Sequence, residues 1–193
     1  MDIKGHKIIL GSGSPRRKEL LGGLDICFEV DTRNTFTEVY SEDTPHEEIP
    51  KVLSEGKSLG FFRELDDNEI LITSDTLVLC DDKVMGKPQD REDAYNMLKT
   101  LSGKSHKVIT AVTVRDRSRM KTVSDVALVH FKDLSDNEIN YYIDNYRPFD
   151  KAGAYGIQEW IGYMGIDRIE GSYFTIMGLP VHLTYDMLIE FIG

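Results

Sequence analysis

Long apolar runs are absent from this chain, and cysteine is scarce, with two among 193 residues. No apolar run approaches the roughly 18 residues that a membrane-spanning helix needs, and residues 1–6 include no apolar segment of the kind found in secretory signals. Cys27 and Cys80 lie far apart, each in an apolar stretch. We therefore expect two buried, reduced thiols rather than a disulfide or a metal pair, which points to the cytoplasm.

Positively charged residues are also fewer than negatively charged ones. The 23 lysines and arginines are outnumbered by 33 aspartates and glutamates, which gives a formal net charge of -10. This balance argues against broad binding of nucleic acid or of anionic membranes, so we expect neither as a partner. It also makes any local cluster of cations informative. Internal repeats, low-complexity segments and long linkers are absent as well, so we expect one domain over residues 1–193.

The most informative stretch begins with the apolar run at residues 8–10. Four small residues, 11–14, come next, and then an amphipathic segment rich in cations. This pattern predicts a buried strand, a tight loop and the start of a helix. Ser14 is placed to cap that helix, and Pro15 suits its first position, where a missing N–H costs nothing.

A helix start of this kind attracts anions, because its free N–H groups and its dipole both favour negative charge. Gly11 and Gly13 let the backbone approach an anion, and Arg16 and Arg17 add forked donors that fit phosphate oxygens. The alternative is an ordinary strand-to-helix turn with two surface arginines. The loop is neither a Walker motif nor a dinucleotide-binding fingerprint, since residues that define each are missing.

Strands and helices are mixed without strict alternation along the rest of the chain, which predicts an α/β or α+β fold with a mixed sheet. Residues 44–47 have the spacing of a capping box, but Pro50 requires a late start or a kink in the helix after it. Further strands are expected at residues 26–30, 69–73, 77–80, 84–85, 106–115 and 122–131, and helices at about 15–24, within 90–103, from 135 to 146 and at about 181–192. Asp90 can cap the helix within 90–103, and residues 135–138 have the spacing of a second capping box.

Asp75 is a candidate for chemistry, because it comes after the predicted strand at 69–73, at the end where open sheets usually place ligands. We expect the strand to break there. The Asp75 carboxylate could ligate a divalent cation or accept a proton from water. The alternative is an aspartate that caps a turn through neighbouring N–H groups.

Other side chains could contribute to a site. Lys87, between a glycine and a proline, could direct its ammonium group at a phosphate, although a surface lysine in a turn fits as well. Gln158 offers a donor and an acceptor side by side, the pair needed to read an imide such as uracil or thymine, or it makes a routine main-chain bond. Glu38 and Lys57 carry no signal of their own, since solvated side chains are the default for both.

The motifs of this chain occur in an order that resembles the Maf family of nucleotide pyrophosphatases, and the resemblance covers nearly the whole chain. The matching segments are residues 12–21, 74–76, 86–88, 101–103, 106–110, 150–158, 171–173 and 178–180. The resemblance implies an α/β fold of the Maf and ITPase-like kind, with a central mixed, twisted sheet flanked by helices and two lobes around a cleft. It further implies an enzyme, usually a homodimer, that hydrolyses a nucleoside triphosphate to the monophosphate and pyrophosphate with Mg²⁺ or Mn²⁺.

Three positions indicate the branch of the family that acts on dTTP and UTP, including modified pyrimidine nucleotides. That branch carries arginine after Ser-Pro, threonine after the key aspartate and glutamine after Tyr-Gly-Ile, and Arg16, Thr76 and Gln158 match it. The sibling branch, which acts on 7-methyl-GTP, differs at these positions. A regulatory protein linked to septum formation is the remaining alternative, since members of the family have been associated with that process.

By the same resemblance, Asp75 is the catalytic proton acceptor and, with Glu38, a ligand of the divalent metal. The implied substrate-binding positions are Ser12, Arg16, Arg17, Lys57, Thr76, Lys87 and Gln158. The chain departs from the family where Glu159 and Trp160 come after this glutamine in place of the usual glycine, and where Thr175 replaces a common asparagine. These departures bear on the preferred base rather than on the reaction.

Overall fold

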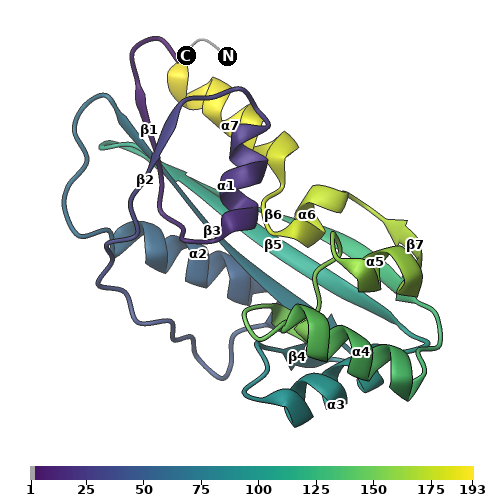
Figure 1. The fold of residues 1–193 in the computed structure, drawn as a ribbon. Helices are drawn as coiled ribbons and strands as arrows, with labels where there is room; N and C mark the ends of the chain where they lie inside the picture. The colour runs from purple at the N-terminus through teal and green to yellow at the C-terminus, as the bar shows by residue number, and fades with distance from the viewer. Residues whose placement is uncertain (1–2) are drawn as a thin grey trace. The chain divides into compact units, whose positions relative to one another are not determined.

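The computed structural model describes residues 3–193, and within that range the chain forms a mixed sheet with helices packed around it (Figure 1). The strand order is β2-β1-β3-β5-β6-β7, with β4 paired to β3 off this path. Strand β1 pairs in parallel with β2 and β3, whereas β4 and β7 run antiparallel to β3 and β6. The predicted α/β class with a central mixed sheet is therefore confirmed.

Strands and helices succeed one another along the chain in the irregular order that the sequence indicated. The strands are β1 Lys7–Leu10, β2 Phe28–Val30, β3 Glu69–Cys80, β4 Lys83–Met85, β5 Ser105–Arg115, β6 Met120–Phe131 and β7 Ile166–Glu170. The α-helices are α1 Pro15–Gly22, α2 Ile49–Leu59, α3 Arg91–Leu101, α4 Asp136–Tyr146, α5 Trp160–Gly165, α6 Tyr173–Met177 and α7 Val181–Ile192, and 3₁₀ turns cover η1 His46–Glu48 and η2 Ala152–Ala154.

These elements gather into two compact units, and each unit is made of separate chain segments. The first unit contains Met1–Asp75, Thr110–Asp125 and Gly178–Gly193, and the second contains Thr76–Ile109 and Val126–Met177. Strands β3, β5 and β6 each contribute residues to both units. The expectation of a single domain over residues 1–193 and that of a cleft between two lobes both stay predictions.

In the first unit, strand β1 lies between β2 and β3 and forms the centre of the core. Ile8 and Leu10 are buried, and so are Ile70 and Ile72, their register partners on β3. Each fully buried aliphatic side chain contributes about 1.5–3 kcal/mol to stability. Helix α2 lies on one side of these strands, and α1 and α7 lie on the other (Figure 1). Both faces of β1 are therefore covered, as its continuous apolar run requires.

The second unit includes the β3–β4 hairpin and helices α3 and α4, which pack against each other. Asp81 and Asp82 turn the hairpin with φ angles of +49° and +58°, the left-handed backbone that such tight turns need. The predicted caps are confirmed for both helices: Asp90 caps α3, and Ser135 opens α4 with a capping box. These local signals fix where the two helices begin.

Two expectations about the first unit were wrong. The capping box predicted at residues 44–47 is replaced by the 3₁₀ turn η1, which has no side-chain cap. Helix α2 starts later, as Pro50 required, because a residue without an N–H fits only the first turn of a helix.

Cys27 is exposed rather than buried, since Ile26 takes the core-facing position beside it. Cys80 is buried as expected, and both thiols are free.

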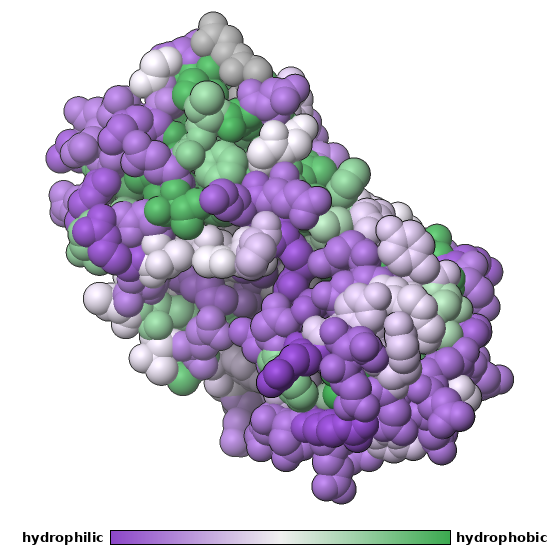
Figure 2. Space-filling view, viewed as in Figure 1, coloured by the Kyte–Doolittle hydropathy of each residue, from purple (hydrophilic) through white to green (hydrophobic). Residues whose placement is uncertain are grey.

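Elements that the sequence did not predict lie in the glycine-punctuated stretch at residues 150–180, which forms η2, α5, β7 and α6. The face shown in Figure 2 is mostly hydrophilic, with apolar side chains in scattered groups. Among residues 3–193, no helix is long and apolar enough to cross a membrane.

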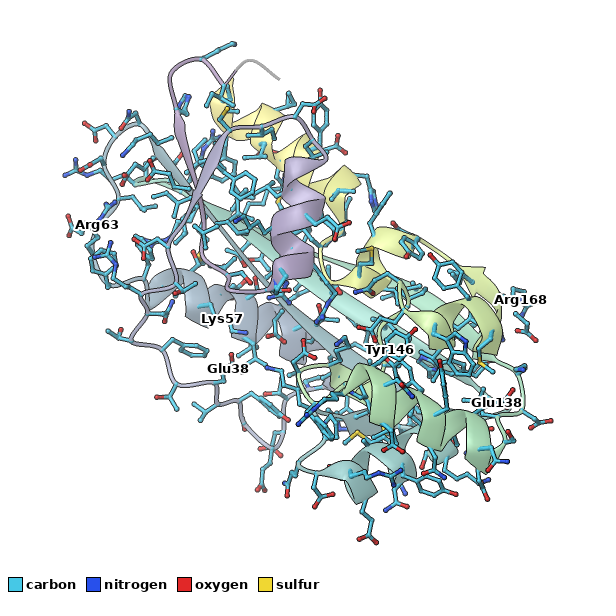
Figure 3. The ribbon with its side chains drawn as sticks, in the orientation of Figure 1. Glu38, Lys57, Arg63, Glu138, Tyr146 and Arg168 are labelled. Carbon is cyan, nitrogen blue, oxygen red and sulfur yellow. The ribbon has the colours of Figure 1, made fainter. Side chains whose placement is uncertain are left out.

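An ion pair between Arg63 and the buried carboxylate of Glu69 lies at the start of β3. The Glu69 side chain is 1% exposed, and Arg63 (labelled in Figure 3) donates to both of its oxygens, at 2.6 and 2.9 Å. These hydrogen bonds are the main reason that the pKa of Glu69 is lowered from 4.5 to about 2. The stabilisation is therefore complete above pH 4.5 and is lost as the pH falls toward 2.

We expect Arg63→Ala to lower the free energy of unfolding by about 3 kcal/mol at pH 7, because the buried Glu69 carboxylate loses both guanidinium donors and keeps only the Asp66 N–H at 3.0 Å and the Lys7 ammonium at 3.6 Å. Urea denaturation of the variant and the parent protein measures this difference, which should shrink as the pH falls from 4.5 toward 2. Arg117→Ala is the matched control, since Arg117 pairs with Asp67 at 2.8 Å on the exposed surface, where a pair contributes at most about 1 kcal/mol. Equal losses for the two variants would contradict the prediction.

Candidate active site

The loop after β1 is tight and closely packed, as its small residues predicted. The Gly11 N–H donates to the Ile72 carbonyl at 2.8 Å, which continues the β1–β3 pairing into the loop. A Cβ atom at Gly11 would lie 2.9 Å from Thr73 Cγ2, so glycine suits this close approach. Ser14 caps α1 by accepting the Arg17 N–H, and Pro15 occupies the first turn. The predicted strand, loop and helix start are confirmed.

Arg17 is held in place by two groups of the first unit. Its Nε donates to the Gly178 carbonyl at 2.8 Å, and its Nη1 donates to Ser12 Oγ at 3.3 Å. Burial lowers the pKa of Arg17; nearby Asp75 and Glu38 raise it, and Arg16 lowers it further. An arginine stays protonated in proteins, so the loop carries a fixed, partly desolvated positive charge close to both carboxylates.

Lys57 contacts both carboxylates that were predicted as site residues, Glu38 and Asp75. Its Nζ donates to Asp75 Oδ1 at 2.5 Å and lies 2.8 Å from Glu38 Oε1. Lys57 extends from α2 toward the segment that carries Glu38 (Figure 3). The Lys57 and Asp75 side chains are 19% and 13% exposed, whereas that of Glu38 is 58% exposed. Two carboxylate oxygens from distant parts of the sequence thus converge on one cation.

A reciprocal pair of hydrogen bonds sets the position of Lys57 opposite Asp75. Ser54 Oγ on α2 donates to the Thr73 carbonyl at 3.2 Å, and Thr73 Oγ1 donates to the Ser54 carbonyl at 2.8 Å. Lys57 lies three residues beyond Ser54 on the same face of the helix, and Asp75 lies two residues beyond Thr73 on the same face of the strand. The buried pair therefore brings the two charged side chains together.

Asp75 does not end a strand, which corrects the prediction. Strand β3 continues from Glu69 through Asp75 to Cys80. Its side chains are buried along both halves, and only Asp75 and Thr76 are partly exposed. Ser74 Oγ lies 2.7 Å from the Ala111 carbonyl on β5 and 3.1 Å from the Gly178 carbonyl in the loop before α7, so its hydroxyl is satisfied by the main chain. The polar Ser-Asp-Thr run resembled a strand end, but Asp75 is presented from mid-strand.

The candidate residues fall into two groups, one in each unit. The first unit holds Ser12, Arg16, Arg17, Glu38, Lys57 and Asp75. This group combines three cations with two carboxylates beside a helix start. It can bind a polyanion through the cations and orient a water molecule through a carboxylate. The role of each residue stays a prediction.

The second unit holds Thr76, Lys87 and Gln158. The Gly86 carbonyl accepts the Gly153 N–H at 3.0 Å, which ties the turn that carries Lys87 to the segment that leads to Gln158. Lys87 is exposed. The Oε1 atom of Gln158 is buried and has no hydrogen-bond partner among the described residues. A buried acceptor without a partner is costly, and a ligand with an N–H group would satisfy it.

The donor set fits a divalent cation that is shared with a substrate. Among residues 3–193, no group of three or more histidine, cysteine, aspartate or glutamate side chains could hold a metal by itself. Glu38 and Asp75, however, already converge on the ammonium group of Lys57. Mg²⁺ commonly takes one or two carboxylates and completes its shell with waters and phosphate oxygens, which is the chemistry that these two side chains offer.

Sequence reasoning missed the carbonyl of Gly178, which lies at hydrogen-bond distance from both Arg17 and Ser74. A main-chain acceptor leaves no side-chain signal. The available indication was the Gly-Leu-Pro segment itself, in which Gly178 has a φ of +109°, a conformation that favours glycine.

A fixed cationic loop beside converging carboxylates defines an α/β protein equipped to handle phosphate esters. In the comparison with known families, residues 7–191 match the family described as Maf-like protein. The chain therefore belongs to the Maf family.

Curated relatives resemble the chain over nearly its full length. The dTTP/UTP pyrophosphatase of Porphyromonas gingivalis strain W83 is 50% identical over 192 residues, covering 98% of this chain and 96% of the relative. The dTTP/UTP pyrophosphatase of Christiangramia forsetii is 47% identical over 191 residues, covering 99% and 97%. Among solved structures, the Staphylococcus aureus Ham1 protein aligns with a TM-score of 0.42 and 11% identity over 66% of this chain and 72% of that chain, too weakly to support an argument.

We expect Arg17→Lys to weaken binding of inorganic tripolyphosphate about tenfold, because lysine keeps the charge but loses the fork that joins Gly178, Ser12 and the anion. Isothermal titration calorimetry measures this affinity. Lys18→Ala is the control, since it removes a charge from an exposed neighbour in the same helix and should change the affinity less than twofold. An unchanged affinity for Arg17→Lys would show that charge alone matters here.

Proposed function

We propose that this chain hydrolyses dTTP and UTP to the nucleoside monophosphate and pyrophosphate. The observation that carries the proposal is the convergence of Glu38 and Asp75 on Lys57 beside the Arg17 loop. The proposal is supported by relatives that bear this activity in their names and are 47–50% identical over nearly the whole chain. It is supported further by Arg16, Thr76 and Gln158, the residues by which the sequence resembles the branch acting on pyrimidine nucleotides.

The cations of the first unit would bind the triphosphate. Arg16 and Arg17 extend from the start of α1, where N–H groups and the helix dipole also favour phosphate. Lys57 would add a third positive charge, and Lys87 is a further candidate from the second unit. Positioned charges of this kind are usually the largest catalytic contribution in phosphoryl transfer, roughly 10²–10³ in rate for each donor.

Asp75 would act on the attacking water. In the proposed step the water oxygen bonds to the α-phosphorus while the bond from that phosphorus to the bridging oxygen breaks. Pyrophosphate leaves with the bridging oxygen, and the water proton passes to the Asp75 carboxylate. Lys57, which donates to Asp75 at 2.5 Å, would hold the carboxylate in one orientation for this transfer.

A divalent cation, Mg²⁺ or Mn²⁺, is part of the proposal, with Glu38 and Asp75 as its ligands. When bound, such a cation would neutralise the phosphate charge and polarise the reacting phosphoryl group. A carboxylate that ligates a metal is a poor proton acceptor, so the two roles assigned to Asp75 compete. Glu38, the more exposed of the pair, would then carry more of the ligation.

Gln158 would read the base. The imide edge of uracil or thymine presents an N–H donor next to a carbonyl acceptor, and a carboxamide pairs with both. The buried Gln158 Oε1 would accept the imide N–H. Thr76 would assist as the second specificity position. A homodimer in the cytoplasm completes the proposal, in keeping with the family resemblance.

Asp75→Asn should lower the rate of pyrophosphate release at least 10³-fold while nucleotide binding stays measurable, because the amide neither accepts the proton nor matches the carboxylate as a ligand. The assay uses dTTP, UTP, CTP, GTP and 7-methyl-GTP, each with Mg²⁺ or Mn²⁺. Asp43→Asn, an exposed aspartate of the same unit, is the control and should turn over normally. Near-normal turnover by Asp75→Asn would refute its role, and release from 7-methyl-GTP alone would refute the assigned branch.

Gln158→Ala should lower the preference for UTP over CTP at least tenfold, because these pyrimidines have the same size and differ at the edge that Gln158 would read. The measurement is the ratio of kcat/KM values for the two nucleotides. Turnover of UTP should persist at high concentration, since the catalytic carboxylates are untouched. An unchanged ratio would remove Gln158 from base recognition.

A further inference from the structure

Gln158 occupies a tight turn whose two ends are bonded to each other. The Glu159 N–H donates to the Gly156 carbonyl at 3.0 Å, which closes a turn over residues 156–159. We call this segment the 156–159 turn. Gln158 is its third residue, so the place from which its side chain leaves the backbone depends on how firmly the turn is held.

The side chain of Tyr142 holds both ends of the 156–159 turn. Tyr142 lies on α4 and is fully buried. Its hydroxyl accepts the Gly156 N–H at 3.0 Å and donates to Glu159 Oε2. Burial and the nearby Glu159 carboxylate raise the pKa of Tyr142, so the hydroxyl remains a donor at any working pH. One phenol thereby satisfies one group at each end of the turn.

Lys151 fixes the other oxygen of the Glu159 carboxylate. Its Nζ lies 3.1 Å from Glu159 Oε1 and 2.7 Å from Asp150 Oδ1. The side chain of Lys151 is 9% exposed and that of Glu159 is 20% exposed. Removing paired charges from water gives little net stability, but a fully bonded polar network defines a single geometry. This network is therefore suited to setting a conformation.

The 156–159 turn is closely packed on the side of Glu159 and Lys151 and on the side of helix α5. A Cβ atom on Gly156 would lie 2.9 Å from the carboxyl carbon of Glu159 and 3.1 Å from Lys151 Cε. On helix α5, a Cβ atom on Gly162 would lie 1.8 Å from the carbonyl oxygen of Ile157. Two glycines thus let the network and the helix press directly against the backbone of the turn.

We propose that Tyr142, Glu159 and Lys151 are positioning residues that fix the amide of Gln158 in the orientation that selects an imide base. This inference rests on the proposed function, in which Gln158 reads the base. The Tyr142 hydroxyl bonds to the first and last residues of the 156–159 turn. The buried Gln158 Oε1 is left without a partner in the described chain. The turn therefore keeps an acceptor available rather than satisfying it internally.

A fixed amide is what discrimination between uracil and cytosine requires. A carboxamide that turns over by half a rotation exchanges its donor and its acceptor. Such an amide would pair with cytosine, which presents an acceptor and an amino group where uracil presents an N–H and a carbonyl. Holding both ends of the 156–159 turn fixes where the Gln158 side chain leaves the backbone and so restricts the positions from which its amide can reach a base. Specificity then depends also on residues that do not contact the base.

The test is Tyr142→Phe, which removes only the hydroxyl. We expect the ratio of kcat/KM for UTP to that for CTP to fall about tenfold to 100-fold, since small displacements of a recognition group have effects of this size. The change for UTP should appear in KM rather than in kcat, because base binding is weakened and the reacting groups are not.

Tyr155→Phe is the matched control. Tyr155 is also buried in the second unit, and its hydroxyl bonds to His106 Nε2 at 2.8 Å rather than to the 156–159 turn. Burial, with a smaller effect from His130, lowers the pKa of His106 to about 4, so His106 stays neutral during the assay. This variant loses one buried hydrogen bond and should keep the wild-type ratio of UTP to CTP.

Glu159 provides a second pair of variants that does not depend on how well Tyr142→Phe folds. Glu159→Ala removes the acceptor of the Tyr142 hydroxyl and should lower the ratio as Tyr142→Phe does. Glu159→Gln keeps an amide oxygen in the same place, so most of the discrimination should return. A purely structural role would instead lower the melting temperature and leave the ratio unchanged.

Gln158→Ala separates this inference from the proposed function. If the network acts through Gln158, then adding Tyr142→Phe to Gln158→Ala causes no further loss of discrimination. If Gln158→Ala lowers the ratio while Tyr142→Phe and Glu159→Ala keep it, the inference is overturned and the proposed function stands. If Gln158→Ala itself keeps the ratio, base reading by Gln158 and its positioning network are both overturned.

Discussion

The arrangement of the first unit depends on the ammonium group of Lys57, which is shared by Glu38 and Asp75. Two carboxylates at one place repel each other, and a cation between them turns that repulsion into attraction. The buried Ser54–Thr73 bonds place Lys57 at this point without using its own charge. Neutral hydrogen bonds therefore bring helix and strand into register, and the ammonium group holds the two carboxylates at one place.

The second unit orients groups by a different principle. Around Gln158 the chain uses a phenol, a buried ion pair and glycines that allow backbone contact. Charge is largely neutralised within this network, whereas in the first unit cations gather around the loop after β1. Within the proposed function, the first arrangement would suit a polyphosphate, because diffuse negative charge needs several donors, and the second would suit a base edge, which one amide can read.

Features set by neighbouring residues could be predicted from the sequence. The caps Ser14, Asp90 and Ser135 form as predicted, because a cap depends only on the next few backbone N–H groups. Tertiary contacts could not be predicted in this way. The position of Asp75 within β3 was missed, since the neighbouring Ser74 is satisfied by two carbonyls distant in the sequence, that of Ala111 on β5 and that of Gly178 in the loop before α7. The motifs identified the candidate residues, but the contact between Lys57 and Asp75 required the fold.

Strands β3, β5 and β6 each contribute to both compact units, so the chain passes from one unit to the other several times. Asp75 and Thr76, joined by one peptide bond, belong to different units. Neither unit is encoded by one continuous stretch of the gene. A single recombination crossover between residues 76 and 177 therefore cannot transfer either unit whole, and exchange of a unit between two genes would need crossovers at several of these boundaries.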